Sequence, residues 1–347
     1  ATDPFDAEAI YFGSQYVHKT TTRGESWQII SGDLTTNDPE KQRQDESGGI
    51  TRDATGAENH TTITTIAPSP AEKEVIWVGT DDGRVHITRS SGGEWEEVGE
   101  RIRGVPDATW VPHIEASFHS GGTAYVVFDD HRRGNWDPFI FRSEDYGRRW
   151  VNIADDSGIR GFVHTVEEDP VTPNLLFAGT EFGLYVSLNR GSDWFPWGHG
   201  VPPVPVRSVV IHPRDHDLVI GTHGRAIYIL DDIRPLRRIA EDPGIVYSPI
   251  HLFRPPPAFL ISEAAVDGYH FSGDGMYQGE TRPRGAILTY WVARGDSLSF
   301  GGEGTTATIR VLTALVSVVR TFEARAREGL NRVAWDLRED FPGAGGS

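Results

Sequence analysis

Short apolar runs alternate with turns of small and polar residues over the first two thirds of the chain. Four segments share one layout, in which an apolar strand, a short turn and a second strand are followed by a small-residue turn ending in Gly-x-x-Trp. These turns end at Trp27, Trp95, Trp150 and Trp194. A fifth copy, 217–231, keeps both strands but lacks the Gly-x-x-Trp turn. Similar segments that recur along a chain are the sequence signature of a repeat architecture, in which each copy forms one structural unit.

The spacing of the repeats predicts a β-propeller. The four tryptophans are 68, 55 and 44 residues apart, so the period is about 55 residues with loops of unequal length. Short strands between glycine-containing turns at this spacing are typical of four-stranded propeller blades. Each blade needs one more strand before the repeated pair, and apolar segments fill that place at 62–67, 113–117, 163–167 and 206–211. We therefore expect an all-β fold with about five blades.

The Gly-x-x-Trp turn is expected to be part of the scaffold. Its hydroxyl or carboxylate side chains can accept hydrogen bonds from the turn's own backbone, and its glycine permits a positive φ. Burial of an indole ring contributes roughly 2–3 kcal/mol by its apolar area. The residues assigned to this structural role are Ser143, Asp145, Gly147 and Trp150, together with Trp27, Trp95 and Trp194.

The turn at 143–150 resembles the Asp-box, or bacterial neuraminidase repeat, with the pattern Ser-x-Asp-x-Gly-x-x-Trp. The other copies have Thr22, Ser90 and Asn189 where that family has Asp, so weaker turns are expected there. Asp-boxes occur in sialidases, xyloglucanases and sortilin-type propellers, where they lie away from the active site. The resemblance therefore implies an architecture and no particular reaction.

A second resemblance covers nearly the whole chain. Segments 76–83, 176–183 and 218–233 are similar to a group of large bacterial proteins described as sortilin-like, or as glycosyl hydrolases with neuraminidase repeats. In that group a small β-sandwich follows the propeller, and 329–338 matches it here. The resemblance implies export to the periplasm, cell surface or medium of a bacterium, without an established activity.

The pattern divides the chain into three parts. Propeller blades are expected over 1–236, a Pro- and Gly-rich linker over 237–285, and a partial, immunoglobulin-like β-sandwich over 286–347. The first repeat opens without an inner strand, and five repeats are few for a closed ring. Because unpaired blade edges are costly, we expect a protein partner or an N-terminal part of the protein to complete the propeller. The longest insertion, 31–60, is expected to cap the channel mouth or to form a solvated loop.

Composition excludes several classes of function. The chain has 33 Lys and Arg against 50 Asp and Glu, a net charge of −17, which argues against binding to nucleic acid or anionic lipid. The absence of cysteine excludes thiolate nucleophiles and Cys-ligated metals. No membrane-spanning run, P-loop, zincin motif or Gly-x-Ser-x-Gly occurs. The Asp pairs lack the spacing of a calcium loop, so neither a metal nor a cofactor is expected.

Candidate chemistry lies at the blade end opposite the Gly-x-x-Trp turns. There the turn between the second and third strands meets the connections between blades, around the mouth of the channel. The channel-face residues expected from this placement are Asp81, Asp82, Arg84, Asp129, Asp130, His131, His164, Glu181, Arg207, His223 and Arg225. The same residues also fit a merely solvated rim of an acidic protein.

Three functions remain open from the sequence. The first is an exported propeller that recognises a peptide, a protein or a glycan at this face. The second is a glycoside hydrolase, in which two rim carboxylates share the work of acid and base. The third is a structural subunit of a cell-surface assembly, with its blade edges covered by partner chains.

Overall fold

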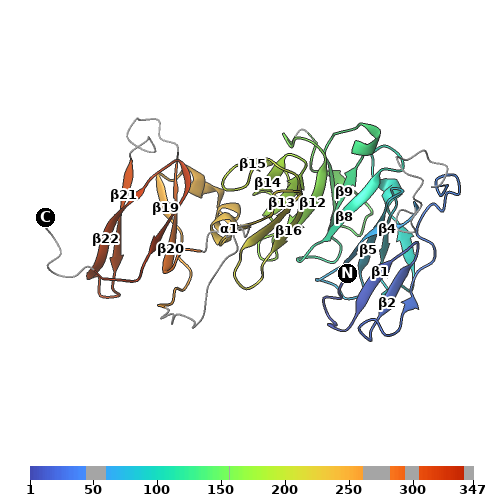
Figure 1. Cartoon of the computed structure of the whole chain (residues 1–347), viewed down its shortest axis with the longest axis horizontal. Coiled ribbons are helices and arrows are strands. Elements are labelled where there is room, and N and C mark those ends of the chain that lie inside the picture. Colours follow the sequence, from blue (N-terminus) through green and yellow to red (C-terminus); the bar gives the residue numbers. More distant parts are fainter. Residues whose placement is uncertain (44–59, 156, 261–281, 294–304, 340–347) are drawn as a thin grey trace, which may run out of the picture. The chain divides into compact units, whose positions relative to one another are not determined.

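The computed structural model describes residues 1–43, 60–155, 157–260, 282–293 and 305–339. They form two compact units, Ala1–Ala240 and Glu241–Ser347, which we call the propeller unit and the C-terminal unit. Nearly all regular structure is β, as predicted, and the sheets of the propeller unit follow one another in chain order (Figure 1). No helix in the described ranges is long and apolar enough to cross a membrane.

Three complete blades form the middle of the propeller unit. Each is a four-stranded antiparallel sheet, and we letter the blades A to E along the chain. Blade B contains β4 (Ile63–Pro68), β5 (Ile76–Thr80), β6 (Val85–Thr88) and β7 (Trp95–Glu97). Blade C contains β8 (Trp110–Ala116), β9 (Ala124–Asp129), β10 (Phe139–Ser143) and β11 (Val151–Asn152). Blade D contains β12 (Val163–Glu168), β13 (Leu176–Thr180), β14 (Gly183–Ser187) and β15 (Phe195–Trp197).

The two end blades have three strands each. Blade A contains β1 (Ile10–Gly13), β2 (Val17–Thr20) and β3 (Gln28–Ile29), and Thr2 forms an isolated bridge with Ile10 at the inner edge of β1. Blade E contains β16 (Val206–Ile211), β17 (Leu218–Thr222) and β18 (Ile227–Leu230). The four inner strands expected from the sequence correspond to β4, β8, β12 and β16.

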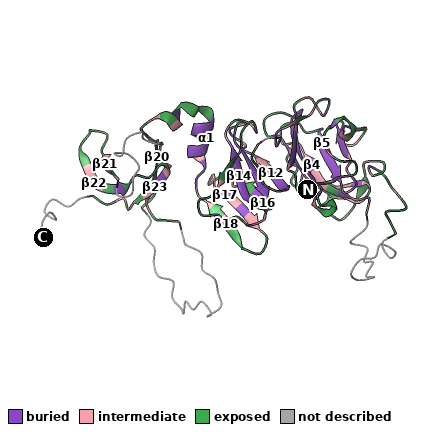
Figure 2. Ribbon diagram, turned by 90° about the horizontal axis from the view of Figure 1, so that it is seen from above, coloured by how far each residue is buried: buried purple, intermediate pink, exposed green. Residues whose placement is uncertain are grey.

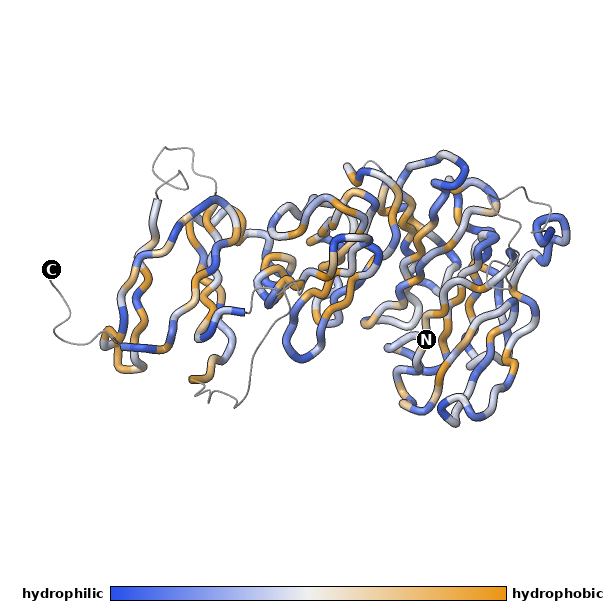
Figure 3. Tube along the Cα trace, viewed as in Figure 1, coloured by the Kyte–Doolittle hydropathy of each residue, from blue (hydrophilic) through white to orange (hydrophobic). Residues whose placement is uncertain are grey.

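The core of the propeller unit lies between neighbouring blades. Trp77 of blade B packs in one apolar cluster with Val111 and Phe141 of blade C, and a second cluster joins blades C and D. A third cluster places Tyr11 of blade A against Val78 of blade B. The second and third strands of blades B to D are accordingly almost fully buried (Figure 2), and hydrophobic residues concentrate in strands while loops are polar (Figure 3).

Polar side chains tie each inner strand to the next. Thr65 Oγ1 accepts the backbone N–H of Ile114 at 3.3 Å, and His113 Nδ1 accepts that of Val166 at 3.4 Å. Glu167 Oε1 accepts the N–H of Ile211 in the same way, at 3.3 Å. Because these groups are partly buried between the blades, their hydrogen bonds help to fix how one blade sits on the next.

The Asp-box-like turn closes on itself. Ser143 Oγ accepts the N–H of Gly147 at 2.9 Å, and Asp145 Oδ1 accepts the N–H of Arg149 at 2.9 Å. Gly147 has φ of 78°, a left-handed conformation that residues with a Cβ rarely adopt. These side-chain bonds satisfy the backbone of a turn that has no strand partner.

The tryptophans of two such turns reach the preceding blade. The indole N–H of Trp194 donates to the carbonyl of Ile153, and that of Trp95 to the carbonyl of Ile30, both at 2.8 Å. Trp27 belongs to blade A, the first of the described blades, and its ring is half exposed. The turn therefore joins blades as well as strands.

The residues expected to form a linker carry regular structure. Helix α1 (Arg234–Glu241) and a 3-10 helix (Pro243–Tyr247) precede β19 (Ile250–Leu252), and 261–281 lie outside the described residues. β19 pairs with β20 (Ala286–Val292), so 250–252 are part of the sandwich and not of a linker. The sequence missed this strand because it has only three residues.

The C-terminal unit is a small β-sandwich. One sheet has the order β19–β20–β23, with β23 at Gly329–Trp335, and the other pairs β21 (Thr306–Leu312) with β22 (Val318–Arg325). Tyr290 and Val292 of the first sheet pack with Ala324 and Ala326, at the end of β22.

Candidate functional site

Five of the eleven expected channel-face residues converge where blades C, D and E meet: Asp129, His131, His164, Glu181 and Arg207. Asp129 ends β9, and a 3-10 helix, His131–Arg133, follows it. His164 and Arg207 are extra residues in β12 and β16, because the pairing register shifts between Val163 and Thr165 and between Val206 and Ser208. Such bulges redirect side chains at the ends of strands.

His164 connects a carboxylate to a guanidinium. Its Nε2 lies 3.0 Å from Glu181 Oε2, and its Nδ1 lies 3.1 Å from Arg207 Nη1. A guanidinium can only donate, so Nδ1 of His164 accepts a hydrogen bond from Arg207. Nε2 therefore carries the proton and donates a hydrogen bond to Glu181. Burial and the nearby Arg207 lower the pKa of His164, so the imidazole stays neutral.

A second carboxylate–histidine pair lies beside the first. Asp129 Oδ1 accepts the backbone N–H of His131 at 3.0 Å and its Nδ1–H at 2.6 Å. Asp129 is buried, and its Oδ2 has no hydrogen-bond partner among the described residues. The charge of Asp129 also raises the proton affinity of His164, which shows that the two pairs are electrostatic neighbours. A buried carboxylate oxygen without a hydrogen bond carries a desolvation cost, which a donor from a ligand would offset.

Aromatic rings surround these polar groups. The His131 ring stacks on Phe162 with centroids 4.3 Å apart, and Phe162 meets His164 edge-on at 4.8 Å. Trp136 lies nearly parallel to Phe182, with centroids 6.2 Å apart and an interplanar angle of 18°. Trp136 and Phe182 are 50% and 49% exposed. We call the whole group the rim cluster: Asp129, His131, Trp136, Phe162, His164, Glu181, Phe182 and Arg207.

Other expected residues serve their own turns. The buried Asp82 Oδ2 accepts the N–H and Oγ1–H of Thr36 at 2.6 and 2.7 Å, and Asp81 Oδ1 accepts the N–H of Thr62 at 2.8 Å. Arg84 forms an ion pair with Glu97. The contacts of Asp81 and Asp82 hold the loop after blade A, and that of Arg84 lies within blade B, so the three residues stand apart from the rim cluster.

The remaining expected residues also lie outside the rim cluster. Asp130 pairs with Arg133 within the loop after β9, and His223 and Arg225 are exposed in the turn between β17 and β18. In the part of the chain that the structure describes, no three His, Asp or Glu side chains are arranged to hold a metal ion.

Sequence reasoning missed the aromatic part of the rim cluster. Trp136 follows Gly134 and Asn135, Phe162 follows Gly161, and Phe182 lies between Glu181 and Gly183. A large aromatic residue beside glycine in a connecting loop has no strand neighbour to pack against. That position was the available signal, because connecting loops commonly carry binding residues.

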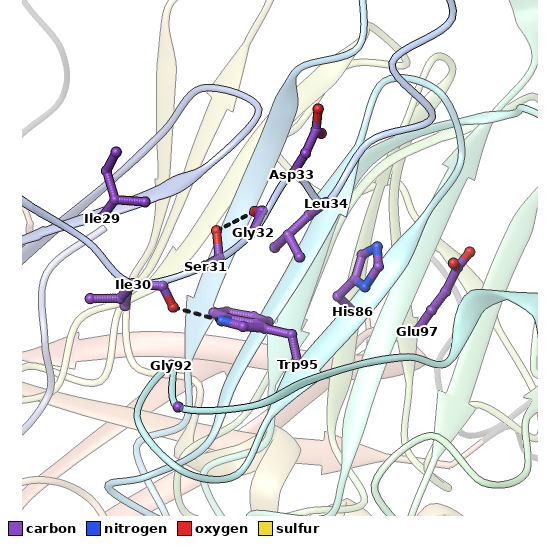
Figure 4. Close-up of a pocket in the computed structure, with 11 residues that line it drawn as sticks. Ile29, Ile30, Ser31, Gly32, Asp33, Leu34, His86, Gly92, Trp95 and Glu97 are labelled. Atoms are coloured by element: carbon purple, nitrogen blue, oxygen red, sulfur yellow. Dashed lines mark hydrogen bonds between the residues drawn. The ribbon is translucent and has the colours of Figure 1, made fainter.

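A groove runs between the outer parts of blades A and B (Figure 4). Its volume is about 650 Å³, and its walls include Ile30 and Leu34 on one side and His86, Trp95 and Glu97 on the other. The Trp95 indole crosses it to the carbonyl of Ile30. His86 hydrogen-bonds to the Leu34 backbone and is buried, and its Nε2 has no partner among the described residues.

Replacing His86 with asparagine is expected to reduce the sensitivity of the fold to acid. Burial lowers the pKa of His86 to about 4, below its unfolded value of 6.5, so the unfolded state binds more protons between these pH values. Stability is therefore lost as pH falls through this window, by about 2 kcal/mol at pH 5. Urea unfolding from pH 7 to 4 should show a shallower loss for His86→Asn. His199→Asn, at an exposed histidine, should leave the slope unchanged.

Comparisons with known proteins give fold-level likenesses. No protein-family model and no curated protein sequence matches the chain. Among solved structures, an ancestral GH74 enzyme aligns with 94% of this chain and 38% of its own, at 15% identity and a TM-score of 0.49. The GH74 xyloglucanase from Xanthomonas campestris aligns with 67% of this chain and 36% of its own, at 18% identity and a TM-score of 0.47.

An extracellular domain from B. thetaiotaomicron is a third such structure. It aligns with 68% of this chain and 27% of its own, at 18% identity and a TM-score of 0.43. The chain therefore spans well under half the length of each of these proteins.

Proposed function

We propose that the propeller unit binds a glycan at the rim cluster. The observation that carries the proposal is the pairing of two nearly parallel, half-exposed rings, Trp136 and Phe182, with the unpartnered carboxylate oxygen of Asp129. The proposal includes membership of the exported, sortilin-like propellers that the sequence resembles, because a binding role agrees with that resemblance.

Sugars have the surface that this arrangement fits. The C–H faces of a pyranose stack on flat aromatic rings, while its hydroxyl groups donate to carboxylates and accept from guanidinium groups. Asp129 Oδ2 is an acceptor without a partner among the described residues, and the exposed Arg207, which gives one N–H to His164, has further donors to offer. Ligand sites typically combine aromatic platforms with a small number of precisely placed polar groups. Because His164 stays neutral, the cluster keeps this hydrogen-bonding pattern at neutral pH.

Binding is better supported than hydrolysis. A glycoside hydrolase needs two carboxyl groups that face each other across the sugar at about 5–10 Å, one of them free to give a proton. Here Asp129 is held by His131, and Glu181 receives the proton of His164. Both carboxylates thus have acceptor roles in the folded protein.

The experiment is a calorimetric titration of the purified chain with neutral oligosaccharides. Cellohexaose and xyloglucan oligosaccharides are the first probes, the latter because one similar structure is a xyloglucanase. Trp136→Ala and Phe182→Ala are each expected to weaken binding about tenfold or more, since one stacked ring contributes on the order of 1–2 kcal/mol. Phe195→Ala is the matched control, at a ring equally exposed on β15.

Two results would contradict the proposal. One is binding that Trp136→Ala and Phe195→Ala change equally, and the other is the absence of binding across neutral, acidic and amino sugars. Release of reducing ends from the same samples would instead establish the hydrolase. Asp129→Asn should then abolish the release while Asp137→Asn leaves it intact.

A further inference from the structure

The third strand of each complete blade carries a ring at one fixed position. In blades B, C and D a hydroxyl side chain accepts the N–H of the turn glycine, and the ring stands two residues before that hydroxyl. The rings are His86, Phe141 and Tyr185, and all three are buried. Phe141 and Tyr185 pack into the apolar clusters that join their blades to the preceding ones, whereas His86 lines the groove between blades A and B.

At the boundary of blades C and D the ring is a phenol. Tyr185 packs there with Ile153 and Ala154 of blade C. Its hydroxyl accepts the backbone N–H of Arg160 at 3.1 Å. The propeller unit therefore holds a phenol at this blade boundary by apolar contacts around the ring and one hydrogen bond at its end.

The boundary of blades A and B has a corresponding wall and a smaller ring. Ile30 corresponds to Ile153, because each donates its backbone N–H to the third strand of its own blade and accepts an indole N–H from the next blade. In place of Tyr185 stands His86, whose imidazole is smaller than a phenol and has no hydroxyl. The groove of about 650 Å³ lies beside this imidazole, and the Trp95 indole is another of its walls (Figure 4).

The groove carries an acceptor without a partner among the described residues. His86 is 7% exposed, one of its ring nitrogens hydrogen-bonds to the Leu34 backbone, and its Nε2 has no partner. A neutral imidazole keeps its single proton on the nitrogen that donates to Leu34, so Nε2 can only accept. A ligand at this place must therefore bring a donor. Because carboxylates of Asp33 and Glu97 also line the groove, a neutral donor fits it better than an anion.

We propose that this groove binds a ligand through a phenol ring, whose hydroxyl donates to His86 Nε2. A phenol is a neutral donor at pH 7, because its pKa is about 10. Its ring has flat apolar faces, which Ile30 and the Trp95 indole can contact. The volume of the groove lies in the range of small-molecule sites, and a phenol already fills the equivalent place beside Ile153.

Fluorine NMR with 4-fluorophenol tests the site on the unmodified chain. The probe should bind with a dissociation constant of about 1 mM or tighter, as expected for one buried ring with one hydrogen bond. 4-Fluoroanisole has the same ring and oxygen but no donor, so its binding should be about tenfold weaker or more. Equal binding of the two compounds, or no binding of 4-fluorophenol, would overturn the proposal.

His86→Phe tests the position with a ring that the fold already holds at Phe141. Phenylalanine removes the acceptor and takes up part of the groove, so 4-fluorophenol should no longer bind. His18→Phe is the matched control, because His18 has the same position in blade A, two residues before Thr20, and is not among the residues that line the groove. Equal binding by the two variants would contradict the proposal. Circular dichroism checks folding, and the comparison of the two probes needs no variant.

Competition with N-acetyl-tyrosinamide identifies the source of the ring. Displacement of 4-fluorophenol at an equal or lower concentration would support a tyrosine side chain of a peptide, because the backbone groups of the competitor then add to binding. Displacement only at higher concentrations would support a free phenolic compound. Both results keep the phenol ring at His86.

Discussion

Replacing Arg237 with methionine is expected to lower the free energy of unfolding of the propeller unit by about 3–5 kcal/mol. Arg237 Nε contacts both carboxylate oxygens of Asp169, at 3.0 and 2.8 Å, and both side chains are buried. Methionine leaves the Asp169 charge buried without its partner. Urea unfolding followed by tryptophan fluorescence reports mainly on this unit, which contains most of the tryptophans.

The large effect follows from what Asp169 organises. Its Oδ1 also accepts the N–H groups of Val171 and Thr172, at 2.9 and 2.7 Å, so it holds the corner after the inner strand of blade D. Arg237 itself belongs to α1 and contacts His216 Nδ1 at 2.9 Å in blade E. The ion pair therefore anchors the helix and the last blade to blade D.

A matched control is the exposed Arg214, which pairs with Asp215 at 2.8 Å. Arg214→Met should leave the free energy of unfolding nearly unchanged, because solvent screens exposed pairs. The double variant Asp169→Asn, Arg237→Met should be more stable than Arg237→Met alone, since it removes the buried charge. A loss below 1 kcal/mol for Arg237→Met would show that the pair does not anchor α1.

The blades could be predicted from the sequence because the contacts that define each strand pair and turn join residues close together in the chain. A strand pair and its Gly-x-x-Trp turn occupy about 20 residues, and the turn's hydrogen bonds, such as Ser143 to Gly147, join residues four apart. The contact of Arg237 with Asp169 joins residues 68 apart. No pattern in the sequence around Arg237 indicates that partner, and 237–241, the second part of α1, were accordingly assigned to a linker.

The rim cluster was predictable in part for a similar reason. Asp129, His131, Glu181, His164 and Arg207 could be placed at one end of the blades from strand order alone. Their mutual contacts depend on two β-bulges, which add His164 and Arg207 to their strands. Bulges depend on the backbone pairing of two strands and leave no clear mark in the sequence. Asp81 and Asp82 have the same placement, but they accept backbone hydrogen bonds from Thr62 and Thr36, at the two ends of the loop after blade A.

Two inner-strand carboxylates that the sequence did not single out should govern the response to alkaline pH. Glu115 and Glu167 occupy equivalent positions in β8 and β12. Burial, helped by the nearby Asp169 and Glu168 and opposed by the hydrogen bond from the Ile211 N–H, raises the pKa of Glu167 to about 8. Burial, then Glu167 and Glu168, raise the pKa of Glu115 well above its ordinary range. At neutral pH the pair therefore retains protons in the folded protein.

Glu167→Gln is expected to stabilise the propeller unit by about 4 kcal/mol at pH 8–9 and to leave it nearly unchanged near pH 4.5. The folded pKa of about 8 exceeds the unfolded value of 4.5, so the folded state binds more protons between them and stability falls as pH rises through this window. Glutamine stays neutral, and its Oε1 still accepts the N–H of Ile211, as Glu167 does. Urea unfolding at intervals from pH 4.5 to 9 measures the effect.

The exposed Glu94 provides the control for this prediction. Glu94→Gln should follow the unmodified chain at every pH, whereas the Glu167→Gln curve should separate from it above about pH 5 and be flatter. Equal curves for all three proteins would mean that Glu167 ionises as freely in the folded state as in the unfolded one. Glu115→Gln should act in the same direction. Because the two carboxyl groups interact, the double variant should gain less than the sum of the two single changes.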